Sequence, residues 1–128
     1  MFPFAGRNAM MQIRVEHRNN IAIMHIEGKL FLENLTSLLN AWEAIIAGNP
    51  EVVAMNCSKL VSIDSSSIGT LVKFFNEAMS KNIELIFYDL NPSVKKLFHT
   101  IHLEKFFSVM NGKKFETDYL KKYCPTAS

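Results

Sequence analysis

The stretch "SIDSSSIGTLV", residues 62–72, places three consecutive serines between an aspartate and an apolar helical repeat. The residues around Asp64 before the serines are mostly apolar, as in a buried strand: Leu60, Val61 and Ile63. Later apolar positions recur at spacings of three and four, which is typical of one helix face: Ile68, Leu71, Val72, Phe75, Ala78 and Met79. The stretch therefore predicts a strand that passes into a helix. In a parallel sheet this junction lies on the side where ligands and partners bind.

The N-terminal half predicts a strand pair, a helix and a third strand. The elements are, in order, a strand at 11–16, a strand at 21–26 that ends at Gly28, a helix from Leu35 to the "GNP" at 48–50, and a strand at 52–55. The short polar link "HRNN" makes an antiparallel strand pair the simplest topology. Asn34 is the expected N-cap of the helix. Because "VVAM" is apolar throughout, residues 52–55 are expected to form the central strand, buried on both faces.

The C-terminal half continues the alternation of helices and strands. The predicted elements are a helix that follows the serines and ends near Asn82, a strand from Ile83, a helix that begins at Asn91-Pro92, an edge strand at 106–110, and a short closing helix with Phe115, Tyr119 and Tyr123. This order predicts an α/β fold with a mixed sheet, and right-handed crossovers where strands run parallel.

Composition indicates an ordinary globular domain. The 128 residues suit one domain with a real core. With 48% hydrophobic residues, 20% charged residues and a net charge of +2, the chain resembles neither a disordered tail nor a nucleic-acid binder. Three lysine pairs are interpreted as solvated surface: Lys95-Lys96, Lys113-Lys114 and Lys121-Lys122. We expect a loose extension at 1–10, the domain at 11–110, and a C-terminal helix or tail at 111–128.

The spacing of the cysteines and the hydropathy of the chain indicate the cellular compartment. Cys57 and Cys124 lack CxxC or zinc-ligand spacing, and Cys57 lies in an apolar run that predicts a buried thiol. The chain shows neither a signal-peptide pattern nor an apolar run of the roughly 18 residues that a membrane span needs. We therefore expect a cytoplasmic protein without membrane insertion.

The serines alone do not indicate an enzyme. Their simplest interpretation is that one caps the helix while the others are exposed. A serine hydrolase would need a GxSxG turn and a suitably placed base, and "DSSSIG" lacks the first glycine. Neither of the two glycine-rich phosphate-binding motifs, GxxxxGK[ST] and GxGxxG, occurs in the sequence. His99 and His102 are interpreted as surface residues because no further metal ligand accompanies them. The sequence thus indicates no catalytic residue, cofactor or metal site.

Two blocks, "IDSSSIGTLV" and "IELIFYDLNPSVKKLF", resemble the STAS domain of bacterial anti-sigma-factor antagonists. The resemblance covers about residues 11–110 and implies a single STAS-like domain with a mixed four- or five-stranded sheet and three to four helices. Asp64 and Gly69 match the first family motif, and Ser66 falls at the phosphate acceptor. The second motif is matched at Asn91, Pro92, Val94, Lys95, Leu97 and Phe98.

The resemblance implies a non-enzymatic adaptor in a partner-switching signalling pathway that regulates transcription. The adaptor would bind an anti-sigma factor that is also a serine kinase, release it once Ser66 is phosphorylated, and be reset by a serine phosphatase. The implied partner-binding residues are Asp64, Ser65, Ser67, Gly69 and Asn91. Phe31 follows the second strand and would lie on the side of Ser66 if the strands run parallel, so it is expected either to join this surface or to act as a staple at the entry of the first helix. This chain departs from the family at two positions. Ser67 replaces a glycine and adds a competing hydroxyl, and Phe31 stands near a common acidic position.

The sequence is also compatible with two other functions. A STAS accessory subunit of a membrane transport complex would dock a helix face permanently on an ATPase and would not need Ser66. A small-ligand sensor would use the serine loop itself. The sequence is equally compatible with a homodimer.

Overall fold

The fold begins with a strand pair whose polar link closes into a tight turn. In the computed structural model, which describes residues 11–121, β1 (Met11–Arg18) pairs antiparallel with β2 (Ile21–Leu30). The later elements are α2 (Leu35–Ala47), β3 (Val52–Ile63), α3 (Ser65–Ser80), β4 (Glu84–Tyr88), α4 (Pro92–Thr100), β5 (Ser108–Met110) and α5 (Gly112–Phe115), followed by a π-helical turn (Glu116–Leu120). The predicted order of elements is confirmed.

The sheet has five strands in the order β1-β2-β3-β4-β5. All neighbours except the first pair run parallel, so the sheet is mixed. β3 lies at its centre, and residues 52–55 are buried on both faces, as predicted. Because β2 and β3 run parallel, their carboxyl ends meet at one edge of the sheet.

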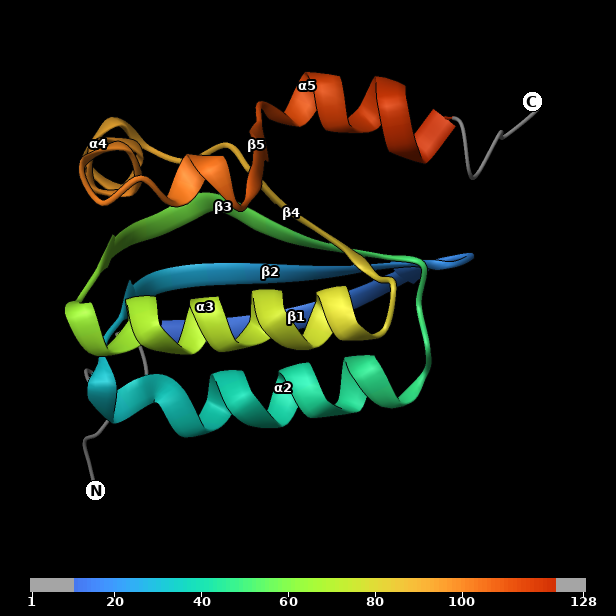
Figure 1. Cartoon of the computed structure of the whole chain (residues 1–128), viewed down its shortest axis with the longest axis horizontal. Helices are drawn as coiled ribbons and strands as arrows, with labels where there is room; N and C mark the ends of the chain where they lie inside the picture. The colour runs from blue at the N-terminus through green and yellow to red at the C-terminus, as the bar shows by residue number, and fades with distance from the viewer. Residues whose placement is uncertain (1–10, 122–128) are drawn as a thin grey trace.

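Helices cover the two faces unequally (Figure 1). α2 and α3 pack side by side on one face, where the Trp42 and Phe74 rings stack with centroids 4.2 Å apart. On the opposite face, the α5 residue Phe115 stacks on Tyr88 over a smaller apolar cluster. No helix within residues 11–121 is both long and apolar enough to cross a membrane.

The ends of several elements differ from the prediction. β2 does not end at Gly28 but passes through it, with a φ of 102°, because Leu30 still pairs with β3. Asn34 precedes α2 without capping it, since its side-chain amide donates to the Lys29 carbonyl at 2.6 Å. The edge strand β5 begins at Ser108 rather than at residue 106.

The buried stripe of α3 is rotated from the predicted one. Its centre follows Ser67, Leu71, Phe74 and Ala78, so the residues at 68, 72 and 75 are only partly buried. Met79, predicted to lie on the apolar face, is 61% exposed. Phe74 was missed and is buried against Trp42. Tyr123 and Cys124, like residues 1–10, lie outside the described residues.

Candidate functional site

The serine stretch lies where the ends of β2 and β3 meet the start of α3 (Figure 1). β3 ends at Ile63, and the helix begins at Ser65 after a single residue, Asp64. The exit of β2 is fastened to this residue, because the Leu30 carbonyl accepts the Asp64 amide hydrogen at 3.2 Å. The arrangement confirms the sequence prediction that a strand passes into a helix at the serines.

Asp64 is the N-cap of α3. One carboxylate oxygen, Oδ1, accepts the Ser67 amide hydrogen at 3.0 Å, and the other, Oδ2, accepts the Leu32 amide hydrogen at 3.0 Å. Burial raises the pKa of Asp64, but hydrogen bonds from Ser67 and Leu32 outweigh this effect and leave the pKa below its ordinary value. A single ionised side chain thus joins the start of α3 to the loop after β2.

Ser67 is the one buried polar residue among residues 11–121, with no exposed surface. Its Oγ lies 2.6 Å from the Leu30 carbonyl oxygen and 2.8 Å from Asp64 Oδ1, so its single hydroxyl hydrogen has two acceptors within reach. The simplest interpretation of the serines was therefore wrong in two respects. An aspartate caps the helix, and one serine is a buried cross-link. Because Ser67 has no exposed surface, its hydroxyl is not accessible to a modifying enzyme.

Ser65 and Ser66 are exposed in the first turn of α3. The Ser66 hydroxyl makes no hydrogen bond within the described part of the chain, and its carbonyl accepts the Thr70 hydroxyl at 3.4 Å. Gly69 lies one turn later on the same helix face. A Cβ at this glycine would meet nothing within 4 Å. The exposed side of this helix start is therefore open to a partner.

Phe31 lies between the two ties to Asp64, those of Leu30 and Leu32. Its backbone is extended and its side chain is partly buried. The next residue, Leu32, is 63% exposed and was missed as a candidate. A leucine in a strand-to-helix link carries no periodic signal, so only the packing reveals its exposure.

Asn91 lies at the start of α4, on the other side of the end of β3. Its side-chain amide donates to the Leu60 carbonyl at 2.9 Å and the Val61 carbonyl at 3.0 Å, while its Oδ1 accepts the Val94 amide hydrogen at 2.8 Å. The predicted N-cap is thus confirmed. With all three groups in use, Asn91 acts within the fold as a brace between β3 and α4.

Within the described residues, the one cysteine is Cys57. Cys57 is buried, as predicted, and burial raises the pKa of its thiol to about 12, with a further contribution from Asp89. No group of three or more histidine, cysteine, aspartate or glutamate side chains within residues 11–121 could hold a metal ion.

Comparisons with known proteins agree with this architecture. The family model of the STAS domain matches residues 12–117. An anti-sigma factor antagonist from Mycobacterium paratuberculosis superimposes with a TM-score of 0.68 and 16% identity, over 78% of this chain and 85% of that one. The Bacillus cell fate determinant SpoIIAA in its phosphorylated form superimposes with a TM-score of 0.62 and 19% identity, over 80% and 90% of the two chains. The unphosphorylated form gives 0.59 and 20%, over 78% and 86%.

Proposed function

The chain belongs to the STAS domain family, and from this premise we propose that it is a phosphorylation-controlled binding protein of the anti-sigma-factor-antagonist type. It binds an anti-sigma factor with serine kinase activity while Ser66 is unmodified, and it releases that partner when Ser66 carries phosphate. A serine phosphatase restores binding. The observation that carries the proposal is the contrast between exposed Ser66 and buried Ser67 in the same helical turn.

A phosphate on Ser66 should leave the fold almost unchanged. It would add about −1.5 to −2 charges at the amino end of α3, where the helix dipole favours an anion by about 1 kcal/mol. The neighbouring Asp64 carboxylate opposes part of this gain. Because the Ser66 hydroxyl has no bond within residues 11–121, its modification breaks no contact in that part of the chain. Against a complementary partner surface, the same charge can cost several kcal/mol.

The proposed partner surface follows the exposed side of α3 and the loop after β2. Ser66, Gly69 and Lys73 lie on one helix face at spacings of three and four. The open space over Gly69 allows close approach by a partner backbone. Leu32 and the partly buried Phe31 supply apolar area beside this face. Ser65 lies at its rim, whereas Asp64 and Ser67 contribute by holding the loop in place.

The direct test is affinity capture with the wild-type protein, Ser66→Ala and Ser66→Asp, read by mass spectrometry. Wild type and Ser66→Ala should retain an anti-sigma factor, and Ser66→Asp should lose it. Ser37→Asp is the matched control, because it also adds an exposed carboxylate to the first turn of a helix. Phosphopeptide mapping should find the phosphate on Ser66. Phosphate on Ser62 or Ser67 with Ser66 clean would contradict the proposal.

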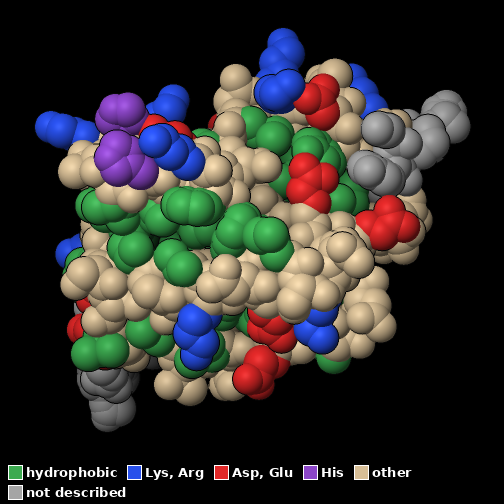
Figure 2. Space-filling view, viewed as in Figure 1, with side chains coloured by type: hydrophobic (Ala, Val, Ile, Leu, Met, Phe, Trp, Pro, Cys, Tyr) green, Lys and Arg blue, Asp and Glu red, His purple; other side chains and the backbone are tan. Residues whose placement is uncertain are grey.

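A second function is favoured by an apolar hollow farther along α3. The hollow has a volume of about 160 Å³ and is lined by Val72, Phe75, Asn76, Leu103, Phe106 and Phe107. Phe106 is 59% exposed, and Figure 2 shows apolar side chains gathered on this side of the molecule. Exposed aromatic residues of this kind are typical of permanent interfaces. The hollow suits an accessory subunit docked on a transport ATPase.

The two functions differ in which variant abolishes capture. For the switch, Ser66→Asp releases the partner and Phe106→Asp has a smaller effect. For the accessory subunit, Phe106→Asp releases the partner and Ser66→Asp does not. Capture of a transport ATPase that is insensitive to Ser66→Asp would replace the switch with the accessory role.

A further inference from the structure

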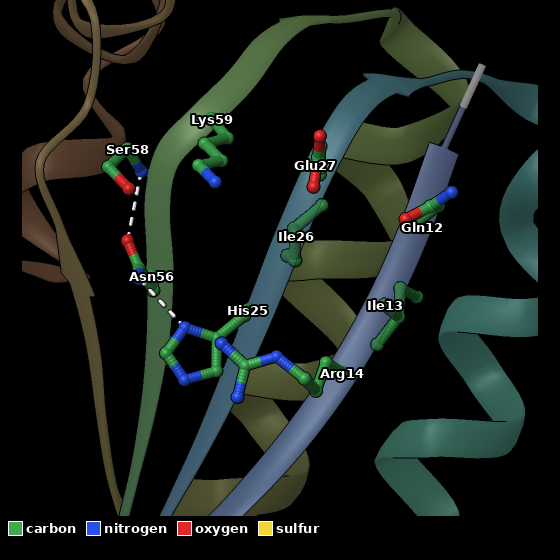
Figure 3. Close-up of a pocket in the computed structure, with 9 residues that line it drawn as sticks. All are labelled: Gln12, Ile13, Arg14, His25, Ile26, Glu27, Asn56, Ser58 and Lys59. Carbon is green, nitrogen blue, oxygen red and sulfur yellow. Dashed lines mark hydrogen bonds between the residues drawn. The ribbon is translucent and has the colours of Figure 1, made fainter. Parts of the chain in front are cut away.

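The sheet face that carries α5 is only half covered. Its apolar half, formed by Ile21, Ile23, Val52, Ala54, Ile86 and Tyr88, is buried beneath Phe115. The other half is polar and holds a groove of about 320 Å³ between β1, β2 and β3 (Figure 3). Its lining residues are Gln12, Ile13, Arg14, His25, Ile26, Glu27, Asn56, Ser58 and Lys59. Ile13 and Ile26 pack into the core on the opposite face, so their side chains add little to the groove.

A β-bulge shapes the groove. In the parallel pair of β2 and β3, His25 lies opposite Asn56 but Glu27 lies opposite Lys59, so β3 contains one extra residue. Cys57 and Leu60 both face the main core, and the two residues between them are exposed. Strict alternation would turn Lys59 toward the core. The bulge instead puts both Ser58 and Lys59 at the groove, and bulges of this kind are common beside functional sites.

A continuous chain of hydrogen bonds holds the floor of the groove. Asn56 Oδ1 accepts the Ser58 amide hydrogen at 3.0 Å, which turns the Asn56 amide nitrogen toward His25 Nδ1 at 2.8 Å. Nδ1 of His25 is therefore an acceptor, and its Nε2–H donates to Glu16 at 2.9 Å. Arg18 binds the other oxygen of Glu16 at 2.8 Å. Hydrogen bonds from His25 and Arg18 keep the pKa of Glu16 below its ordinary value. A floor whose groups are already oriented reduces the entropy lost on binding.

The rim carries cations with no partner in the described part of the chain. Arg14 and Lys59 are exposed and form no ion pair with any residue among 11–121, and Glu27 is the only acidic residue of the lining. In Figure 3, Arg14 reaches from β1 across the sheet toward His25, and Lys59 lies on β3. The side chains of Gln12 and Ser58 add neutral donors. The groove therefore offers mainly hydrogen-bond donors and an excess of positive charge.

We propose that this groove is a binding site for a small organic anion that carries a phosphate or a carboxylate group. Arg14 would grip the anionic group with its planar guanidinium fork, and Lys59 would contact it from the opposite strand. A volume of about 320 Å³ lies at the small end of the range for ligand pockets, which suits a molecule no larger than a mononucleotide. The site is distinct from the serine loop and does not depend on phosphorylation of Ser66.

Backbone amide shifts measured by nuclear magnetic resonance test the proposal with three probes: inorganic phosphate, citrate and adenosine monophosphate. Saturable shifts should concentrate at Arg14, Glu27, Asn56, Ser58 and Lys59. A response to phosphate and the nucleotide alone identifies the phosphate group as the ligand chemistry, and a response to citrate alone identifies the carboxylate. No saturable response to any of the three overturns the proposal, as does a response spread evenly over all lysine-bearing surfaces.

Variants of the lining residues then show which side chains contribute to the binding free energy of the anion. The double variant Arg14→Gln and Lys59→Gln should weaken binding at least roughly tenfold, because it removes two charge-assisted contacts. Lys95→Gln with Lys96→Gln, which removes two exposed cations from α4, should bind as the wild type does. Glu27→Gln should tighten binding, and Ser66→Asp should leave it unchanged. Equal affinities for the Arg14/Lys59 double variant and the wild type would overturn the assignment of the site.

Discussion

Two helix starts flank the end of β3, and they use the same cap in different ways. Asp64 and Asn91 each accept the amide hydrogen of the residue three positions later. The Asp64 carboxylate can only accept hydrogen bonds. It accepts them from the Leu32 amide in the loop after β2 and from the Ser67 hydroxyl. Asn91 also donates, and it uses both amide hydrogens on β3 carbonyls. The first cap leaves two exposed serines and an open glycine beside it, whereas the second closes its junction. The Asp64 junction therefore leaves exposed surface for the proposed partner, whereas Asn91 braces β3 against α4.

The largest effect is expected where the brace is broken. Asn91→Asp keeps the capping oxygen Oδ1. It replaces the amide NH₂ group, which donates both hydrogen bonds to β3, with a carboxylate oxygen that faces the Leu60 and Val61 carbonyls. It should lower the free energy of unfolding by about 3 kcal/mol, because the part-buried Leu60 carbonyl and the more exposed Val61 carbonyl lose their donors and repel the carboxylate. Urea denaturation measures this. A loss below about 1 kcal/mol would mean that the bonds to β3 contribute little.

Phe31→Ala tests whether the Asp64 side is the binding surface. The proposal expects a loss of about 2 kcal/mol in partner affinity, as for an aromatic anchor, with a stability loss well below the roughly 3 to 5 kcal/mol of a buried phenylalanine. Titration of the captured partner and thermal melts measure the two quantities. Val61→Ala, an exposed apolar residue on the Asn91 side, is the control. A large fall in melting temperature with unchanged affinity would make Phe31 a packing residue only.

Asp64→Asn sharpens the comparison between the two caps. An amide at this position cannot accept from both Ser67 and Leu32, so one donor is left facing an NH₂ group. We expect a loss of about 1 to 2 kcal/mol in urea denaturation at neutral pH. If the loss equals that of Asn91→Asp, the two caps do not differ in the way described above.

The lowered pKa of Asp64 predicts that the stability of the fold depends on pH. Because the pKa of Asp64 is lower in the folded state than its ordinary value, ionised Asp64 stabilises the fold. This contribution is complete above the unfolded-state pKa of about 3.9 and is lost as pH falls through the lower folded-state value. Urea midpoints measured from about pH 6 down to about pH 3 should fall less for Asp64→Asn than for the wild type. Parallel curves for the two proteins would contradict this expectation.

The smallest effects separate the two neighbouring serines. Ser67→Ala removes a buried hydroxyl and should cost about 1 kcal/mol, and the Leu30 carbonyl retains its bond from the Asp64 amide. Ser66→Ala should change stability by less than about 0.5 kcal/mol, since its hydroxyl is exposed. Thermal melts of the two variants measure the difference. A larger loss for Ser66→Ala would show that this hydroxyl contributes to the fold.

Short-range patterns predicted much of the architecture. Three elements follow from patterns that act within a few residues: the strand at 11–16, where apolar and polar residues alternate, the apolar strand at 52–55, and the helix that begins at Asn91-Pro92. The errors occur where a distant contact intervenes. β2 continues past Gly28 because β3 supplies pairing partners there, and Asn34 bonds backward to Lys29 rather than capping its own helix.

The sequence by itself determined the order of elements, the position of the serines at a strand-to-helix junction, and the family motif around Asp64 and Ser66, because hydropathic period and capping chemistry are local properties. Only the tertiary structure decided which serine is buried, since Ser67 bonds a carbonyl 37 residues away, at Leu30. It also decided that Lys59 faces the polar groove, because a bulge changes alternation only when a neighbouring strand sets the register. Contacts between distant segments decide which side chains are buried and which are exposed. A local sequence pattern carries no information about such contacts.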